Sequence, residues 1–173
     1  ALAKESGFEV TGSDLHCYPP ISDQLEHLGI NVIPNYDPAQ LNSKPDLIVV
    51  GNVMSRGMPI IETMLNLNIP FTSGPQWLGE NVLRDRTVIA VSGTHGKTTT
   101  TSMLGAILEG ASLEPTIIVG GIVQDFQSNS LLGNGDIIVI EADEYDKTIL
   151  SLNPKMSIVT NIDLEHVDCY PNI

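Results

Sequence analysis

Short apolar runs rich in valine and isoleucine recur along the chain, and each one ends in polar or glycine-rich residues. Apolar and polar positions do not alternate within the runs. This is typical of strands buried on both faces, as in a parallel sheet covered by helices. The pattern predicts strands over residues 8–11, 47–50, 88–91, 116–119, 137–140 and 157–160.

Between these runs, apolar residues recur at helical spacing over residues 22–28, 58–67 and 97–109. Ser22 is the expected cap of the first helix, and Gly29 and Gly110 are placed to end the first and the third. Strands that alternate with helices predict an α/β fold with mostly parallel sheets. The expected apolar faces are Leu25 and Leu28 in the first helix, Ile60, Ile61, Met64 and Leu65 in the second, and Met103, Leu104, Ile107 and Leu108 in the third.

The charged segment 84–86 precedes a strongly apolar strand and is the expected domain boundary. Residues 1–86 then form one α/β unit, and residues 87–173 form the first part of a second. A Rossmann-like first unit needs an earlier strand and a glycine-rich turn before residues 1–6, whose sequence is typical of the end of a helix. This, with the missing initiator Met and the abrupt end after Pro171-Asn172-Ile173, predicts a chain cut at both ends.

Composition narrows the possible partners. Of the 173 residues, 42% are apolar and 17% charged, which is enough apolar material for packed cores. Eight Lys and Arg against 21 Asp and Glu give a formal net charge of −13 with no basic stripe, so nucleic acid and anionic membranes are disfavoured. An anionic ligand in a locally positive pocket stays compatible with this charge.

Two further features concern the compartment. No apolar run approaches the roughly 20 residues that a membrane-spanning helix needs. The two cysteines, Cys17 and Cys169, lie far apart without metal-type spacing. Isolated thiols favour a reducing compartment, so a cytoplasmic location is predicted.

The strongest motif joins the apolar run 88–91 to a glycine-rich turn and then to a helix, through residues 93–99, Gly-Thr-His-Gly-Lys-Thr-Thr. In a phosphate loop, backbone N–H groups of the turn and of the helix N-terminus converge on phosphate oxygens. Lys97 would then contact the β- and γ-phosphates, and the Thr98 hydroxyl is a candidate Mg²⁺ ligand. The usual loop has a glycine where this chain has Val91, so the motif is a shortened variant. A plain strand–turn–helix with a surface lysine is the alternative.

An acidic segment follows the run 137–140. It places four carboxylates within six residues, those of Glu141, Asp143, Glu144 and Asp146. Ligands of open α/β sheets bind at the carboxyl ends of the strands, and carboxylate oxygens suit Mg²⁺. A magnesium site beside the phosphate loop is therefore predicted, and a solvated acidic loop is the alternative.

Polar residues also follow the run 157–160, among them Asn161 and His166. His166 is a candidate metal ligand or a side chain that orients a phosphate. An isolated histidine is more often a structural or surface residue. The functional interpretation rests on three strand ends meeting at one edge of a sheet.

Four polar residues of the first unit are weaker candidates. Asp14 follows a strand, where an acidic residue often contacts a ribose hydroxyl, although a turn or a helix cap explains it equally well. Asn52, Ser55 and Arg56 follow the run 47–50. Arg56 is a candidate phosphate contact, and an ordinary surface arginine is the alternative.

These motifs resemble the Mur ligase family of ATP-dependent amide-bond ligases in peptidoglycan metabolism. Residues 93–101 are similar to the phosphate loop of its UDP-N-acetylmuramate-using branch, and 141–146 and 160–168 match the next two motifs in order and spacing. Residues 12–14, 18–22, 51–57 and 73–78 resemble members that attach the tripeptide L-alanyl-γ-D-glutamyl-meso-diaminopimelate. Residues 150–162 resemble members that attach L-alanine, and Glu165 stands where the family usually has Asp.

The resemblance implies an N-terminal UDP-substrate domain, a central P-loop ATPase-like domain and a C-terminal domain outside this chain. It also implies ATP and Mg²⁺, and an acyl phosphate that the incoming amine attacks. A non-enzymatic nucleotide-binding domain and an unrelated phosphotransferase are the alternatives. The role of His95 stays open between substrate contact and loop shaping. The implied residues are Lys97, Glu141 and His166 for catalysis, Gly93, Thr94, His95, Gly96, Lys97, Thr98 and Thr99 for ATP, Thr98, Glu141 and His166 for metal, and Asp14, Asn52, Ser55, Arg56 and Asn161 for substrate.

Overall fold

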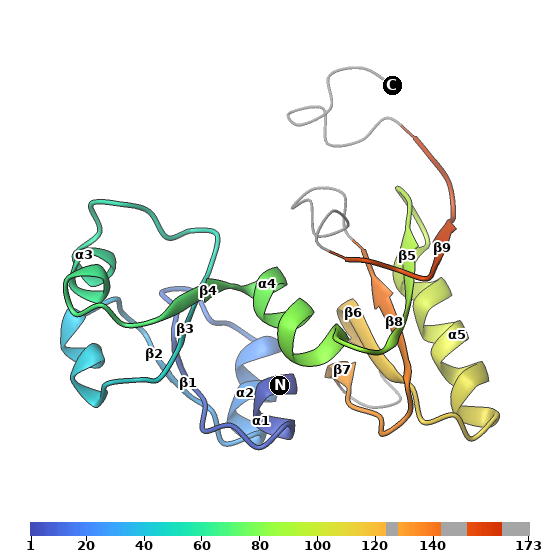
Figure 1. Ribbon diagram of the computed structural model, residues 1–173, viewed down its shortest axis with the longest axis horizontal. Coiled ribbons are helices and arrows are strands. Elements are labelled where there is room, and N and C mark those ends of the chain that lie inside the picture. Colours follow the sequence, from blue (N-terminus) through green and yellow to red (C-terminus); the bar gives the residue numbers. More distant parts are fainter. Residues whose placement is uncertain (124–127, 143–151, 164–173) are drawn as a thin grey trace. The chain divides into compact units, whose positions relative to one another are not determined.

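The computed structural model describes residues 1–123, 128–142 and 152–163 (Figure 1). The chain divides into two units between Leu78 and Gly79. Both are α/β, and all but one of the strand pairings in the described residues are parallel. The predicted fold class is therefore confirmed.

The first unit contains two small parallel sheets. Strand β1 (Thr11–Ser13) pairs with β2 (Asn31–Ile33), and β3 (Ile48–Val50) pairs with β4 (Phe71–Ser73). The helical segments are α1 (Leu2–Glu5), α2 (Ile21–His27), the 3-10 helix η1 (Pro38–Ser43), α3 (Pro59–Asn66) and α4 (Gly74–Leu78). The core of this unit forms where the apolar face of α3 meets η1 and β3, around Leu41, Ile60, Ile61 and Met64.

The second unit is built on one five-stranded sheet in the order β7-β6-β8-β5-β9. The π-helical turn η2 (Gly79–Leu83) precedes it, and only β7 runs antiparallel, against β6. Helix α5 (Lys97–Gly110) packs against β6, β8 and β5 (Figure 1). The strands are β5 (Thr87–Ser92), β6 (Thr116–Val123), β7 (Ser128–Leu131), β8 (Ile137–Glu141) and β9 (Met156–Val159).

The two central strands β5 and β8 carry the core of this sheet. Val91, Ile138 and Val139 have no exposed surface. Burial of an aliphatic side chain contributes about 1.5–3 kcal/mol. These uninterrupted apolar runs therefore fix β5 and β8 side by side in the middle of the sheet, with their carboxyl ends at the same edge.

Several strands were missed or misplaced by the sequence pattern. The strand expected over residues 8–11 begins only at Thr11. Strands β2 and β4 are three residues long, and β7 is the polar sequence Ser-Asn-Ser-Leu at a sheet edge. Such short or polar segments lack the apolar run on which the prediction relied.

The expected cap of α2 was also wrong. Pro20 occupies the N-cap position without a side-chain capping bond, and Ser22 lies inside the helix. The Ser22 hydroxyl donates to the neighbouring Asp23 carboxylate at 3.1 Å instead.

The buried face of α5 also differs from the predicted one. Met103 and Ile107 are 61% and 65% exposed, whereas Thr101 and Gly105 are buried. A Cβ atom on Gly105 would overlap Ile117 of β6, so the missing side chain lets the helix approach the sheet closely. On the helix side, small residues and not large ones therefore line the contact with Ile117 of β6.

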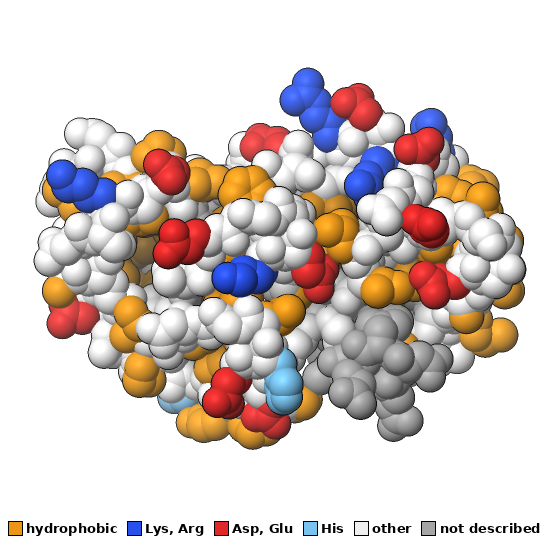
Figure 2. Space-filling view, turned by 90° about the horizontal axis from the view of Figure 1, so that it is seen from below, with side chains coloured by type: hydrophobic (Ala, Val, Ile, Leu, Met, Phe, Trp, Pro, Cys, Tyr) orange, Lys and Arg blue, Asp and Glu red, His pale blue; other side chains and the backbone are white. Residues whose placement is uncertain are grey.

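On the face shown in Figure 2, Lys and Arg side chains are interspersed with acidic ones. No described helix has the length and apolar character needed to cross a bilayer.

The close packing of α5 gives a first prediction. Gly105→Ala should lower the free energy of unfolding by about 1–3 kcal/mol relative to Gly110→Ala, because overpacking a filled contact forces side chains to shift. Gly110 is the last residue of the same helix and has open space around its Cα, so alanine there adds a methyl group without a clash. Denaturant titration measures the difference, and equal stabilities would contradict the packing argument.

Candidate functional site

The glycine-rich turn lies at the carboxyl end of β5, between Ser92 and the first residue of α5, Lys97. Gly96 is the N-cap residue, with φ +82°. The first helical bond runs from Thr100 N to Gly96 O at 2.9 Å, so the amides of residues 97–99 have no acceptor inside the helix. Together with the helix dipole, such amides suit an anion.

Lys97 folds back over the turn that precedes it. Its Nζ donates to the Gly93 carbonyl at 2.7 Å and contacts the Thr94 carbonyl at 3.5 Å. The ammonium group is thereby held over residues 93–94, within one turn of the α5 amides. The structure thus brings together the cation and the helix end that the phosphate-loop motif predicted.

Glu141 ends β8, directly beside β5, because Glu141 is the register partner of Val91. Its Oε2 accepts a hydrogen bond from Thr98 Oγ1 at 2.9 Å and one from Gly120 N at 2.8 Å. Residues from α5, β6 and β8 therefore meet at one carboxylate oxygen. The sequence predicted the Thr98 and Glu141 partners but missed Gly120, whose only signal was a Gly-Gly pair late in an apolar run.

The Thr98 hydroxyl and the Glu141 carboxylate form a pair of hard oxygen donors, and this donor set fits Mg²⁺. Among residues 1–123, 128–142 and 152–163, no group of three or more His, Cys, Asp and Glu side chains is placed to hold a metal. The predicted ligand His166 and the carboxylates of Asp143, Glu144 and Asp146 lie outside the described residues.

The segment after β9 lies against the turn from the other side. Asn161 Oδ1 accepts from His95 N at 2.9 Å, and Asn161 Nδ2 donates to His95 O at 3.0 Å. The Thr160 hydroxyl also donates to His95 O, at 2.6 Å. The structure therefore places Asn161, a predicted substrate contact, on the backbone of the phosphate loop.

Gly93 is the point of closest approach between the two segments. Its φ is +123°, and a Cβ atom there would overlap Thr160 Oγ1 and lie 2.8 Å from Asn161 O. Both the backbone angle and the contact therefore require glycine.

The candidate residues of the first unit make local contacts. Asp14 Oδ1 accepts from His16 N at 2.9 Å, which is the turn interpretation of this residue. Arg56 forms a two-point ion pair with Glu62, at 2.9 and 3.2 Å. Hydrogen bonds from Gly57 N and Arg56 lower the pKa of the Glu62 carboxyl. Asn52 and Ser55 are surface-accessible residues of the turn before Arg56.

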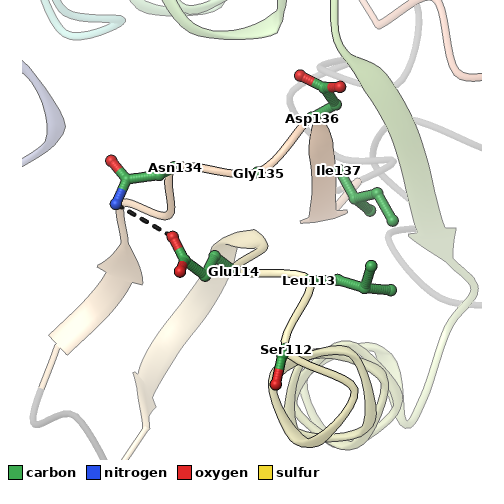
Figure 3. Close-up of a pocket in the computed structure, with 7 residues that line it drawn as sticks. All are labelled: Ser112, Leu113, Glu114, Asn134, Gly135, Asp136 and Ile137. Atoms are coloured by element: carbon green, nitrogen blue, oxygen red, sulfur yellow. Dashed lines mark hydrogen bonds between the residues drawn. The ribbon is translucent and has the colours of Figure 1, made fainter.

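A separate hollow of about 380 Å³ lies where β8 begins, at the opposite end of the strands from the glycine-rich turn (Figure 3). Its lining comes from residues 112–114 after α5 and residues 134–137 at the start of β8. Asn134 Nδ2 donates to Glu114 Oε2 there at 3.1 Å. Because β5 and β8 run parallel, this amino-terminal edge is remote from the phosphate loop and Glu141.

Comparison with known protein families separates the chain into two matched parts. Residues 1–86 match the profile described as "Mur ligase family, catalytic domain", and residues 91–173 match the "Mur ligase middle domain". The chain belongs to the Mur ligase family.

Individual relatives agree. A UDP-N-acetylmuramate–L-alanyl-γ-D-glutamyl-meso-2,6-diaminoheptanedioate ligase of Haemophilus influenzae is 48% identical over 99% of this chain and 40% of its own length. A UDP-N-acetylmuramate–L-alanine ligase of a Psychrobacter strain is 38% identical over 99% of this chain and 35% of its own. The chain thus spans less than half of the length of these relatives.

A solved structure shares the fold. The UDP-N-acetylmuramate:L-alanyl-γ-D-glutamyl-meso-diaminopimelate ligase from Neisseria meningitides superposes with a TM-score of 0.89 at 44% identity. The match covers 98% of this chain and 58% of that one.

The close approach at Gly93 gives a second prediction. Gly93→Ala should lower the free energy of unfolding by more than about 2 kcal/mol, since it adds both backbone strain and a clash with backbone atoms. Gly96→Ala is the matched control, because Gly96 also has positive φ but nothing within 4 Å of its Cα position. The control should cost only about 1–2 kcal/mol. Denaturant titrations of both variants check this, and equal losses would contradict the close contact with residues 160–161.

Proposed function

We propose that the protein is an ATP-dependent ligase that joins L-alanyl-γ-D-glutamyl-meso-diaminopimelate to UDP-N-acetylmuramate in peptidoglycan recycling. The observation that carries the proposal is the contact of Thr98 and Glu141 beside the Lys97 loop. This combination of a cation, a helix N-terminus and a carboxylate that can bind a metal suits a nucleoside triphosphate with its Mg²⁺. The tripeptide is favoured because relatives with that acceptor are 46–48% identical to the chain, against 36–41% for the L-alanine ligases.

The chemistry needs an activated carboxylate, because a free carboxylate has oxide as its leaving group. ATP transfers its γ-phosphoryl group to the carboxylate of the UDP-substrate and leaves as ADP. The amine then attacks the acyl phosphate, loses a proton and expels phosphate, which leaves the amide. Bringing a carboxylate to a triphosphate gathers negative charge, so catalysis rests on neutralisation and positioning. Lys97 supplies positive charge at the transferring phosphate, and the α5 amides orient the phosphate chain. Thr98 and Glu141 would hold Mg²⁺, and His166 would hold a second ion.

The two domains predicted from the sequence divide the task in this proposal. Residues 87–173 bind ATP, and residues 1–86 bind the UDP-substrate, with Asp14, Asn52, Ser55 and Arg56 as candidate contacts. Arg56 is engaged with Glu62 in the structure, so a phosphate contact would require it to exchange that partner. The substrates are cytoplasmic metabolites in this scheme, and the protein would act there.

The L-alanine ligase activity is the second candidate. It is supported by relatives 38–41% identical over 94–99% of the chain. The two activities share every step except the amine, so the described site does not favour one over the other. The acceptor therefore has to be identified by experiment.

The proposal predicts ATP consumption that depends on both co-substrates. The protein expressed from its complete gene should release phosphate from ATP only with UDP-N-acetylmuramate and an amine present. Free tripeptide should be used in preference to L-alanine. Coupled phosphate assays with each component omitted measure this. Equal turnover without UDP-N-acetylmuramate would contradict the ligase, and a preference for L-alanine would select the second candidate.

Removal of the loop cation gives a further prediction. Lys97→Ala should lower kcat by at least about 10²-fold, the order found when one donor to developing charge is lost. Lys155→Ala is the control, because Lys155 is an exposed lysine of the same unit that contacts Thr87 at 3.4 Å. Initial rates and thermal melting should be measured together. Loss of the folded state in Lys97→Ala, or an equal loss of rate in the control, would argue against a phosphate contact.

A further inference from the structure

Asn161 makes an unusual pair of bonds with one residue of the phosphate loop. Its side-chain oxygen accepts from the His95 N–H and its side-chain nitrogen donates to the His95 carbonyl. Only one of the two amide orientations satisfies both bonds, since the other would face oxygen with oxygen and nitrogen with N–H. The side chain therefore pairs with the backbone of His95 as a neighbouring strand would.

We propose that Asn161 is a positioning residue that fixes the conformation of the phosphate loop through the backbone of His95. The inference rests on the proposed function, because it takes the loop to be the ATP site. It assigns Asn161 a different task from substrate contact. It also favours loop shaping over substrate contact for the backbone of His95.

The neighbouring residues reinforce the same contact. Thr94 N donates to Asn161 O at 3.3 Å, and the Thr94 hydroxyl accepts from Asp163 N at 2.9 Å. Thr160 N donates to Ser92 O at 3.0 Å, which extends the pairing of β5 and β9 up to the turn. Residues 160–163 thus hold residues 92–95 along their length, and within this segment the Asn161 side chain accepts the bond from the His95 N–H.

The contact between Asn161 and His95 determines which backbone N–H groups of the loop can donate to a phosphate. The N–H of His95 is directed at Asn161, so it is not presented to a ligand in this conformation. The amides of residues 97–99 lie beyond that point, at the start of α5. By holding His95, Asn161 sets the direction in which the chain enters the helix and hence the direction of these amides. Loss of the two hydrogen bonds from Asn161 to the His95 backbone should therefore weaken ATP binding without removing any group that touches ATP.

The test compares Asn161→Ala with Asn134→Ala in protein expressed from its complete gene. Asn134 is an exposed asparagine of the same unit, hydrogen-bonded to Glu114 at the opposite edge of the sheet. Amide hydrogen exchange is measured on residues 93–96 without nucleotide, and the affinity for MgATP and for UDP-N-acetylmuramate is measured by titration. Two hydrogen bonds are lost in Asn161→Ala, so exchange at His95 should be at least about tenfold faster and the Kd for MgATP about tenfold higher.

The Kd for UDP-N-acetylmuramate should stay within about twofold, and the control should match the wild type in every measurement. Unchanged exchange at His95 would overturn the proposal. So would fast exchange with wild-type MgATP affinity, and so would a selective loss of UDP-N-acetylmuramate affinity.

Asn161→Asp covers the case in which the alanine variant does not fold. The carboxylate keeps the acceptor for the His95 N–H but places an oxygen against the His95 carbonyl. MgATP affinity should fall at least about tenfold, and wild-type affinity in this variant would overturn the proposal. The exchange measurement needs no nucleotide. If the wild type does not bind MgATP, the proposed function fails, while the exchange data still decide whether Asn161 holds the loop.

Discussion

The pairing of β5 with β8 on one side and β9 on the other is the constraint on which the candidate site depends. Val91 of β5 and Ile138 and Val139 of β8 have no exposed surface, so the register of these two strands is fixed by the core and not by the polar residues that follow. That register places Glu141 beside Val91 and Val159 beside Ser92. The polar groups at the three strand ends therefore meet around one glycine-rich turn because β8 and β9 both pair in parallel with β5.

The same geometry explains how a chain with net charge −13 can present a site for a polyphosphate. The positive field is local and comes from the Lys97 ammonium and from the amino-terminal end of α5. Glu141 is the acidic exception, and its partners are a hydroxyl and a backbone N–H, not a cation. A carboxylate in such surroundings is ready to accept a divalent ion, which reverses the sign of the field at that point.

The sequence predicted the parts of this site that follow from strong local patterns. The phosphate-loop residues and Glu141 were predictable because each lies directly after a long apolar run. The contact of Gly120 with Glu141 and the bonds from Asn161 to the His95 backbone were not predictable, because they depend on which strands become neighbours. The buried face of α5 was mispredicted for a related reason. Gly105 faces Ile117, and this contact orients the helix so that two of its large apolar residues remain exposed. The three-residue strands β2 and β4 carry too few residues to show a period.

A crystal structure of the complete protein with a non-hydrolysable ATP analogue and Mg²⁺ tests the central claim most directly. The account predicts that the Lys97 ammonium leaves the Gly93 carbonyl for the phosphate chain, while both Asn161 bonds to the His95 backbone stay within hydrogen-bonding distance. The phosphates should lie against the amides of residues 97–99. A complex in which the His95 N–H leaves Asn161 and binds a phosphate oxygen would contradict the account.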